Sequence, residues 1–249
     1  MDHLPQHLAI IMDGNGRWAQ QRRMPRIVGH QRGVETVRRT VEECSRLGIR
    51  YLTLYAFSSE NWGRPADEVA ALMGLLAKYL TSELKTLLSN RIRLNVIGEI
   101  GKLPESIRTT LEETMARTRE NDTMTLTLAL SYGSRDEILR ACRSIAAKVA
   151  NGELSADRVN EELFSAELDT FGIPDPDLLV RTSGEMRISN FLLWQLAYTE
   201  LYFCDVYWPD FSTEELHKAL SGFSNRQRRF GLTSEQAQET LPSSKGAGH

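Results

Sequence analysis

Two kinds of hydrophobic pattern alternate along most of this chain. Short apolar runs, and one stretch in which apolar and polar residues alternate, predict β-strands at 8–12, 51–57, 92–97, 124–130, 178–180 and 201–203. Between them, apolar residues recur every three or four positions, which predicts helices at 34–47, 66–88, 104–119, 135–149, 156–164 and 213–223. Gly48 follows the first of these helices as a stop signal, and Pro65 precedes the second.

This alternation of strands and helices predicts an α/β fold with a mainly parallel central sheet flanked by helices. We expect a single domain over residues 1–231 and a flexible C-terminal tail over 232–249, where polar residues and glycine replace almost all apolar ones. In such sheets ligands bind beyond the carboxyl ends of the strands. The loops that follow strands are therefore the places to look for chemistry.

Composition narrows the class of protein. The chain has 249 residues, 41% of them hydrophobic, which is sufficient for a substantial core. Its net charge of −3 argues against a dedicated nucleic-acid-binding protein. No apolar run approaches the roughly 18 residues of a membrane-spanning helix, and the first residues lack the features of a signal peptide. Cys44, Cys142 and Cys204 are odd in number and widely spaced, so we expect reduced core residues in a cytoplasmic protein.

The loop after the first strand combines two glycines with concentrated positive charge. Gly14 and Gly16 allow a tight turn whose backbone amides can bind an anion. No Asp or Glu occurs between residues 14 and 34. Five arginines lie in this stretch: Arg17, Arg22, Arg23, Arg26 and Arg32. Their charge suits a multiply charged anion such as a diphosphate, and Asp13 before them is the type of ligand that Mg²⁺ uses together with substrate phosphates.

Two other interpretations of this loop stay open at this point. The spacing Gly14-x-Gly16-x-x-Ala19 also matches the glycine pattern of dinucleotide-binding proteins. Against it, the polar stretch 20–25 is unlike the helix that this pattern requires, the acid expected after the second strand is absent, and Trp18 would crowd a dinucleotide. The second alternative is a basic loop that is merely solvated.

Two later loops repeat the combination of hydroxyl, amide and arginine side chains. After the second strand, four side chains can bind phosphate or serve helix entry: Ser58, Ser59, Asn61 and Arg64. Residues 181–191 follow a later apolar strand and supply two arginines, hydroxyls and a glycine turn. Two anion pockets at one edge of a sheet indicate two phosphorylated substrates. A third basic cluster lies at 226–231.

Several blocks, in order along the chain, resemble the signature sequences of the cis-prenyltransferases, most closely the bacterial undecaprenyl diphosphate synthases. They lie at 13–19, 29–30, 55–62, 181–185, 187–195 and 200–203. The first block reads Asp-Gly-Asn-Gly-Arg-Trp-Ala and the last reads Glu-Leu-Tyr-Phe. The resemblance runs from Leu8 to Gly231, and blocks of this length in one order are highly specific.

The resemblance implies a homodimeric α/β protein with a hydrophobic tunnel over the sheet. It implies sequential cis-condensation of isopentenyl diphosphate onto an allylic diphosphate, usually farnesyl diphosphate, with Mg²⁺ as cofactor. The product would be a long-chain polyprenyl diphosphate, namely undecaprenyl diphosphate as precursor of a cell-wall glycan lipid carrier. Such a protein would be cytoplasmic, would contact the inner face of the membrane transiently to release its product, and would not bind nucleic acid.

By the same resemblance each matching residue takes a role. Asp13 is the catalytic aspartate and, with Glu200, a metal ligand; the proton acceptor is the pyrophosphate itself or a group near Asn61 or His30. The allylic diphosphate pocket comprises Gly14, Asn15, Gly16, Arg17, Arg26 and His30. The isopentenyl diphosphate pocket comprises Arg181, Arg187 and Ser189. The lid and active-site wall comprise Trp18, Ser58, Ser59, Glu60, Asn61, Trp62 and Arg64. Arg229 and Gly231 would complete the site of the partner subunit.

The growing chain needs a dry tunnel, because burial is worth about 0.8 kcal/mol per CH₂. We expect helices 66–88 and 104–119 and the strand 124–130 to form its walls, with Ala56 at the throat and Met124 at the floor. An apolar stripe is more often core than tunnel, and only the resemblance favours the tunnel. Three positions depart from the family pattern: Ser131, Ser134 and Met186.

Two rival functions can be distinguished from this one. A non-catalytic partner subunit of the same fold would be expected to lack Asp13 and the phosphate-binding loop, both of which are present. A nucleotide-dependent oxidoreductase would carry bound NAD(P), which its absorbance would reveal. A trans-type prenyltransferase would need a pair of DDxxD motifs, and the chain has none.

Overall fold

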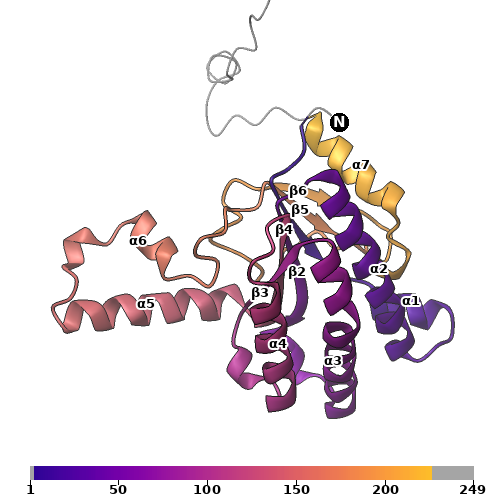
Figure 1. The fold of residues 1–249 in the computed structure, drawn as a ribbon, viewed down its shortest axis with the longest axis horizontal. Coiled ribbons are helices and arrows are strands. Elements are labelled where there is room, and N and C mark those ends of the chain that lie inside the picture. The colour runs from indigo at the N-terminus through magenta and orange to yellow at the C-terminus, as the bar shows by residue number, and fades with distance from the viewer. Residues whose placement is uncertain (1–2, 226–249) are drawn as a thin grey trace, which may run out of the picture.

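The computed structural model describes residues 3–225, which are built around one six-stranded sheet (Figure 1). The strand order is β3-β4-β2-β1-β5-β6, and every pair of neighbouring strands is parallel. The strands are β1 (His7–Ile11), β2 (Tyr51–Ser58), β3 (Ile92–Ile97), β4 (Met124–Tyr132), β5 (Leu178–Arg181) and β6 (Glu200–Phe203). The predicted α/β fold with a parallel sheet is therefore confirmed.

Helices connect the strands, and several begin or end where proline or glycine predicts. They are α1 (Asn15–Gln21), α2 (Arg26–Leu47), α3 (Ala66–Ser89), α4 (Glu105–Thr118), α5 (Ser134–Ala150), α6 (Glu161–Ala166) and α7 (Thr213–Ser224). Pro25, Pro65 and Pro104 directly precede α2, α3 and α4, where a missing N–H has no cost. Gly48 ends α2 in the left-handed conformation, with φ of 82°.

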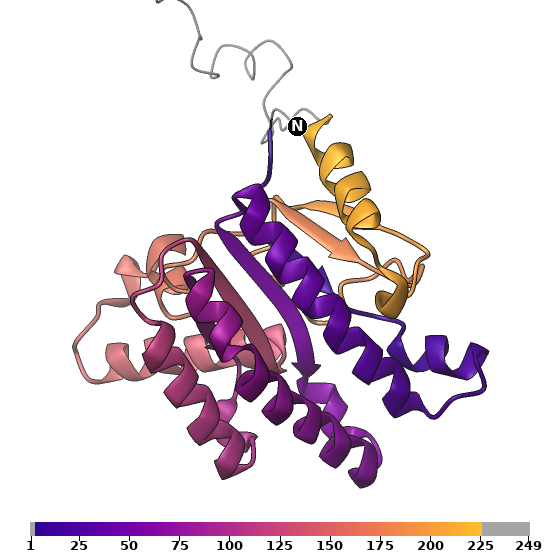
Figure 2. The same ribbon diagram turned by 45° about the vertical axis from the view of Figure 1, so that its right-hand side comes forward.

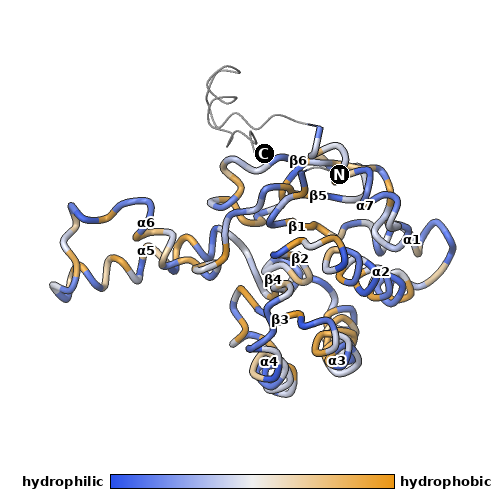
Figure 3. The backbone as a smooth tube through the Cα atoms, turned by 45° about the horizontal axis from the view of Figure 1, so that its top comes forward, coloured by the Kyte–Doolittle hydropathy of each residue, from blue (hydrophilic) through white to orange (hydrophobic). Residues whose placement is uncertain are grey.

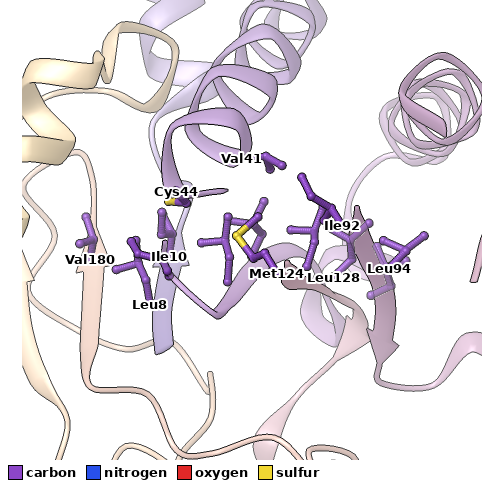
Figure 4. Close-up of a cluster of buried hydrophobic side chains, with 14 of the residues drawn as sticks. Leu8, Ile10, Val41, Cys44, Ile92, Leu94, Met124, Leu128 and Val180 are labelled. Atoms are coloured by element: carbon purple, nitrogen blue, oxygen red, sulfur yellow. The ribbon is translucent and has the colours of Figure 1, made fainter. Parts of the chain in front are cut away.

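One face of the sheet is covered by helices α2, α3, α4 and α7, which share its main hydrophobic core (Figure 2). Val41 and Cys44 of α2 belong to this core together with Leu8 and Ile10 of β1, and Cys44 lies near Ile10 (Figure 4). The burial pattern explains the apolar runs of the sequence, since every residue of β1 and β5 is buried.

The opposite face has a smaller core, and much of its cover is not helical. Ala9, Ala129 and Leu179 pack there against Phe191 and Leu192 of the segment that follows β5. Helices α5 and α6 extend away from the sheet as an arm (Figures 1 and 3). The parallel sheet is thus buried on both sides, although by different kinds of structure.

Three expectations from the sequence need correction. A seven-residue helix, α1, follows Gly14 directly, where the sequence predicted only a turn and a polar loop. The helix expected at 156–164 is two short pieces, η3 (Ala156–Arg158) and α6. Cys44 is buried as expected, but Cys142 is exposed, because it lies on the solvent side of α5. All three cysteines are free. The tail at 232–249 lies outside the described residues.

Candidate active site

Asp13 follows β1 at the carboxyl edge of the sheet, beside the end of β5. β2 lies next to β1 on one side, and β5 lies next to β1 on the other side. The chain therefore extends the sheet first in one direction from β1 and later in the other, and ligands of α/β sheets bind at such a switch point. Several hydrogen bonds fix the backbone of Asp13. Its N–H donates to Thr182 Oγ1 at 3.0 Å, and its carbonyl accepts from the N–H of Trp208 at 3.0 Å and from Thr182 Oγ1 at 2.7 Å. The neighbouring Ile11 and Arg181 are register partners.

The Asp13 carboxylate lies between two arginines. Its Oδ2 accepts from Arg181 Nη2 at 2.9 Å and contacts Arg17 Nη2 at 3.1 Å. Its Oδ1 accepts from the backbone N–H of Gly14 at 2.6 Å. Burial alone would raise the pKa of Asp13, but the hydrogen bond from Arg181 and the charge of Arg17 outweigh burial and hold this pKa below its usual value. Asp13 is therefore ionised at neutral pH.

On one side of Asp13, Arg181 and Arg17 form the first candidate anion pocket. Arg181 is buried, and its Nη1 donates to Ser189 Oγ at 2.8 Å and to the Arg187 carbonyl. Arg17 donates to Ser183 Oγ at 2.6 Å and pairs with Glu185 at 2.9 Å. The structure thus brings Asp13, Arg181 and Ser189 together and adds Glu185. It also places Arg17, which the resemblance assigned to the allylic diphosphate pocket, on this side of Asp13.

The loop that carries this pocket has an unusual backbone. Ser183, Ser189, Asn190 and Leu192 all have positive φ, between 48° and 78°. Non-glycine residues adopt this conformation at a cost, and such residues cluster at functional sites. The Asn190 side chain is held at both ends: its Oδ1 accepts from the N–H of Arg135, and its Nδ2 donates to Glu60 at 2.8 Å.

On the other side of Asp13, polar residues surround the mouth of an apolar cavity of about 190 Å³. Asn15, His30 and Arg64 line the mouth. Arg26 lies beside it, because a Cβ atom at Gly16 would be only 2.9 Å from Cζ of Arg26. His30 Nε2 and Asn15 Oδ1 are buried and have no hydrogen-bond partner among the described residues. These residues form the second candidate anion pocket, and two of its buried polar atoms have no partner among the described residues.

The position of Asn15 depends on close packing of α1 against α2. A Cβ atom at Gly29 would lie 2.0 Å from the Asn15 carbonyl oxygen, and one at Gly33 would lie 2.3 Å from Asn15 Oδ1. Burial and the nearby charge of Arg64 lower the pKa of His30 to about 4, so that His30 is neutral at pH 7. The pocket therefore derives its positive charge from arginines and not from histidine.

The segment after β2 closes the mouth of the cavity. Asn61 lines the cavity, and its Oδ1 accepts from the N–H of Ser58 at 3.1 Å. Trp62 Nε1 donates to Ser131 Oγ at 2.9 Å, which ties this segment to β4. Ser59 lies beside Gly133. Trp18 is buried beneath Arg22, whose guanidinium lies 4.2 Å from the indole ring centre, and is not among the cavity-lining residues.

The cavity lining agrees with part of the expected tunnel walls. Residues of α3 and β4, such as Leu72, Tyr79 and Leu128, line the cavity as expected, and α2 and β2 add to the lining. The start of α4 lines a separate hollow together with α3. Met124, expected at the floor, is a core residue at the start of β4 and does not line this cavity. Ala56 does line it, because a bulge between Tyr55 and Phe57 displaces Ala56 from the β2–β4 register.

The arginine-rich stretch 14–34 has less unpaired positive charge in the folded protein than its sequence suggests. Acids pair with four of its five arginines: Glu185 with Arg17, Asp210 with Arg22, Glu68 with Arg26, and Glu35 with Arg32. The first three acids are distant in the chain, and Glu35 lies three residues after Arg32. Sequence reasoning missed Glu68 and Glu185. For Glu68, the i,i+4 spacing from Arg64 was an available signal, and the two side chains do pair at 3.0 Å.

The three departures from the family pattern have different outcomes. Ser131 and Ser134 are buried and serve as local anchors, since Ser131 Oγ accepts from Trp62 and Ser134 Oγ accepts from the N–H of Leu193 at 2.9 Å. Met186 is 80% exposed and supplies no polar atom to the site. None of the three disturbs the contacts of Asp13.

One predicted metal ligand, Glu200, is not brought to this site. Glu200 begins β6 and is the register partner of Leu178, so it lies at the amino edge of the sheet, opposite to Asp13. Arg229 and Gly231 lie outside the described residues. Within residues 3–225, no three acidic, histidine or cysteine side chains are grouped so as to hold a metal ion. Asp13 fits Mg²⁺ only as a single carboxylate that acts together with phosphate oxygens and waters.

An ionised aspartate between two arginine-bearing candidate pockets, beside a cavity, suits an enzyme whose substrates have anionic heads and apolar tails. The family described as "Putative undecaprenyl diphosphate synthase" matches residues 11–231. The chain belongs to this family and is a transferase of prenyl groups. Members act on isoprenoid diphosphates and generally use a divalent metal.

Named relatives agree with this assignment. The chain is 61% identical to an isoprenyl transferase of Geobacter sulfurreducens, over 94% of this chain and 96% of the relative. It is 51% identical to one of Clostridium tetani, over 93% and 91%. A crystal structure of lavandulyl diphosphate synthase from Lavandula x intermedia with dimethylallyl diphosphate has a TM-score of 0.89, 39% identity and coverage of 92% and 98%. A probable undecaprenyl diphosphate synthase from Campylobacter jejuni has a TM-score of 0.76, 35% identity and coverage of 93% and 100%.

Proposed function

We propose that this protein elongates an allylic diphosphate by successive cis-condensation with isopentenyl diphosphate, with farnesyl diphosphate as primer and undecaprenyl diphosphate as product. The observation that carries this proposal is the position of Asp13 between two cationic pockets at the mouth of an apolar cavity. The named relatives support the same reaction class, and one of them was crystallised with an allylic diphosphate.

Each pocket takes one head group. The allylic diphosphate binds at the cavity mouth, where Asn15, Arg26, His30 and Arg64 meet it and its tail enters the cavity. Isopentenyl diphosphate binds at Arg181, with Ser189, Arg187 and Arg17 around it. The allylic C–O bond breaks and leaves pyrophosphate, the alkene of isopentenyl diphosphate attacks the allylic carbon, and one proton is lost.

The charge that develops on the leaving pyrophosphate is the main barrier in an apolar site. Guanidinium groups held in place before the reaction stabilise this charge without reorganisation. The ionised Asp13 would hold Mg²⁺ against the pyrophosphate, and the ion would add further charge neutralisation when bound. Glu200 is at the other edge of the sheet and contributes no ligand to this site within one chain.

The pyrophosphate itself is the best acceptor for the lost proton. His30 has a pKa of about 4 and is therefore a weak base in the empty site. Asn61 has no basic atom, and its Oδ1 already accepts from the N–H of Ser58. We assign Asn61 to orienting the substrate at the cavity mouth, together with Ser58, Ser59, Glu60 and Trp62 in the closing segment.

The apolar cavity supplies the driving force for retaining the growing chain. Each isoprene unit adds five carbons, whose burial is worth about 4 kcal/mol. Ala56 is the small residue that leaves room at the cavity entrance.

We also propose that the protein works as a homodimer in the cytoplasm and contacts the membrane surface transiently to release its product. Leu139 of α5, in the arm, is 50% exposed, and Phe171, after α6, is 72% exposed. We place the subunit interface here, because burying such side chains between two copies would remove apolar surface from water. No helix within residues 3–225 is long and apolar enough to cross a bilayer. Sedimentation equilibrium of wild type and Leu139→Asp tests the dimer.

The decisive experiment incubates the purified chain with labelled isopentenyl diphosphate, farnesyl diphosphate and Mg²⁺ and sizes the lipid product. Asp13→Asn should lower turnover by about 10²–10³ while leaving the fold intact. Asp122→Asn is the matched control, because Asp122 is an exposed acid paired with Arg91 far from the pockets, and it should leave turnover unchanged. Near-normal turnover of Asp13→Asn, or no lipid product from wild type, would contradict the proposal.

A further inference from the structure

A second hollow lies between α3 and the start of α4. These two helices run side by side over the same face of the sheet (Figures 1 and 2). The hollow measures about 560 Å³, and its lining is apolar or small except for Arg64 and Ser106. This volume lies within the roughly 300–1,000 Å³ of ordinary ligand pockets. The hollow is therefore large enough to hold an apolar group.

The hollow and the apolar cavity share part of their lining. Met73 of α3 and Arg64 at the mouth line both spaces. Otherwise α3 turns different sides to them, because Leu72 and Leu76 line only the cavity and Ala70 lines only the hollow. Met73 is 5% exposed and belongs to both linings. Its side chain is therefore a partition between the two spaces.

Methionine is a partition that can open while the backbone stays in place. Its side chain is unbranched, rotates about several bonds and adapts to irregular apolar gaps. The structure also leaves free space for a displaced side chain, since a Cβ atom at the adjacent Gly74 would have no neighbour within 4 Å. A change of rotamer at Met73 is therefore sufficient to join the hollow to the cavity.

The position of Met73 along α3 makes access to the hollow depend on the length of the tail. Helix α3 begins at Ala66, and Met73 lies about 10 Å further along the helix axis. Tyr79 is the last residue of α3 in the cavity lining, and its large ring is buried. A short tail ends before Met73, whereas a longer one meets Met73 and Tyr79 in a cavity of only about 190 Å³. Each further isoprene unit is stabilised if it stays out of water, and the hollow offers it an apolar surface.

We propose that the hollow between α3 and α4 is a second binding site for the apolar end of the growing isoprenoid chain, which enters it past Met73 once the tail exceeds the cavity. This inference rests on the proposed function, because it takes the head group at the cavity mouth and the first part of the tail in the cavity. Met73 then influences product length, and the start of α4 forms one wall of the extended tail site.

The direct test places a thiol in the hollow of the full chain. Ala70→Cys introduces it at an exposed position that lines the hollow and not the cavity. A polyprenyl diphosphate of product length should slow alkylation of this thiol by N-ethylmaleimide severalfold, whereas farnesyl diphosphate should leave the rate unchanged. Lys78→Cys is the matched control, because Lys78 is exposed on the same helix and lines neither space. Peptide mass spectrometry distinguishes the introduced thiol from the native cysteines.

Two further variants connect the hollow to product length. Ala70→Phe fills the hollow and leaves the cavity lining unchanged, so its lipid products should be shorter by one or more isoprene units. Lys78→Phe adds the same ring outside both spaces and should give products of wild-type length. Met73→Ala removes the partition. When it is combined with Ala70→Cys, polyprenyl diphosphates shorter than the product should already protect the thiol.

Several results would overturn this inference. Equal alkylation of the Ala70→Cys thiol with and without the long polyprenyl diphosphate would show that the chain does not enter the hollow. Protection by phosphatidylglycerol vesicles alone would assign the hollow to membrane lipid instead. Products of wild-type length from Ala70→Phe, or equal shortening by Lys78→Phe, would separate the hollow from elongation. The same chain-length threshold with and without Met73→Ala would show that Met73 is not the partition.

Each of these results leaves the proposed function intact if wild type still elongates the isoprenoid. A wild-type protein that makes no lipid product refutes the proposed function, and the inference about the hollow falls with it.

Discussion

Lowering the pH from 7 to 5 should destabilise the protein through two buried histidines, His7 and His30. Burial lowers the pKa of each from 6.5 to about 4, and the charge of Arg64 adds to the effect at His30. Because the folded-state pKa lies below the unfolded one, the unfolded chain takes up protons first as the pH falls. This contribution to stability is fully present above about pH 6.5 and is lost as the pH falls toward about 4.

With these pKa values, linkage gives a loss of about 1.8 kcal/mol per histidine between pH 7 and pH 5. The two histidines together should therefore remove about 4 kcal/mol from the free energy of unfolding. His30→Gln removes one of the two titrations and should reduce this loss to about 2 kcal/mol. Urea unfolding of both proteins at pH 7 and pH 5 measures the difference, in which the other titrating groups largely cancel.

Equal losses in wild type and His30→Gln would show that His30 is not the buried, neutral group that the structure places at the cavity mouth. Binding provides a second check on the same residue. A pyrophosphate beside His30 favours the protonated ring, so its pKa should rise and the complex should take up a proton near pH 6. Calorimetry in two buffers of different ionisation enthalpy detects this uptake, and a binding heat independent of buffer would contradict it.

Two other predictions follow from the packing around the site. Ala56→Leu should fill the cavity entrance and shorten the lipid product, measured by chromatography, and an unchanged product length would remove Ala56 from the cavity wall. Gly29→Ala should destabilise the protein by about 1–3 kcal/mol and weaken pyrophosphate binding, because its Cβ would meet the Asn15 carbonyl at 2.0 Å. A Cβ atom at Gly74, in the middle of α3, would have no neighbour within 4 Å. Gly74→Ala should therefore stabilise the protein by about 0.5–1 kcal/mol, measured by urea unfolding.

The sequence predicted most of the fold because buried parallel strands carry a strong local signal. The runs at β1 and β5 are apolar at nearly every position, since both faces of these strands are covered. The rule that ligands bind at the carboxyl ends of strands then brought the loops of Asp13 and Arg181 to one edge. The β1–β5 register, in which Ile11 pairs with Arg181, confirms that placement.

The pairing of charges and the shape of the cavity depend on contacts between residues far apart in the chain, which local sequence patterns do not predict. Glu68 reaches Arg26 from 42 positions away in the chain, so a stretch without acids did not remain unpaired in space. The cavity lies between α2 and α3 because those helices are neighbours over β2 and β4, which hydrophobic spacing alone does not determine. Ala56 lines the cavity at a bulge in β2, and no local feature of the sequence predicts this bulge.

The position of Glu200 in the sheet could not be predicted from the local sequence pattern. The motif Glu-Leu-Tyr-Phe forms β6, where the hydrophobic pattern predicted a strand at 201–203, but the side chains at the two ends of a strand lie at opposite edges of the sheet. Register pairs Glu200 with Leu178, and Leu178 with Leu8, which is five residues before Asp13. At about 3.3 Å per residue, Glu200 and Asp13 are separated by about 16 Å along the strands. Since Mg²⁺ holds its oxygen ligands at about 2.1 Å, the two carboxylates of one chain cannot share an ion. Any effect of Glu200→Gln on pyrophosphate affinity must therefore originate outside the head-group site of its own protomer.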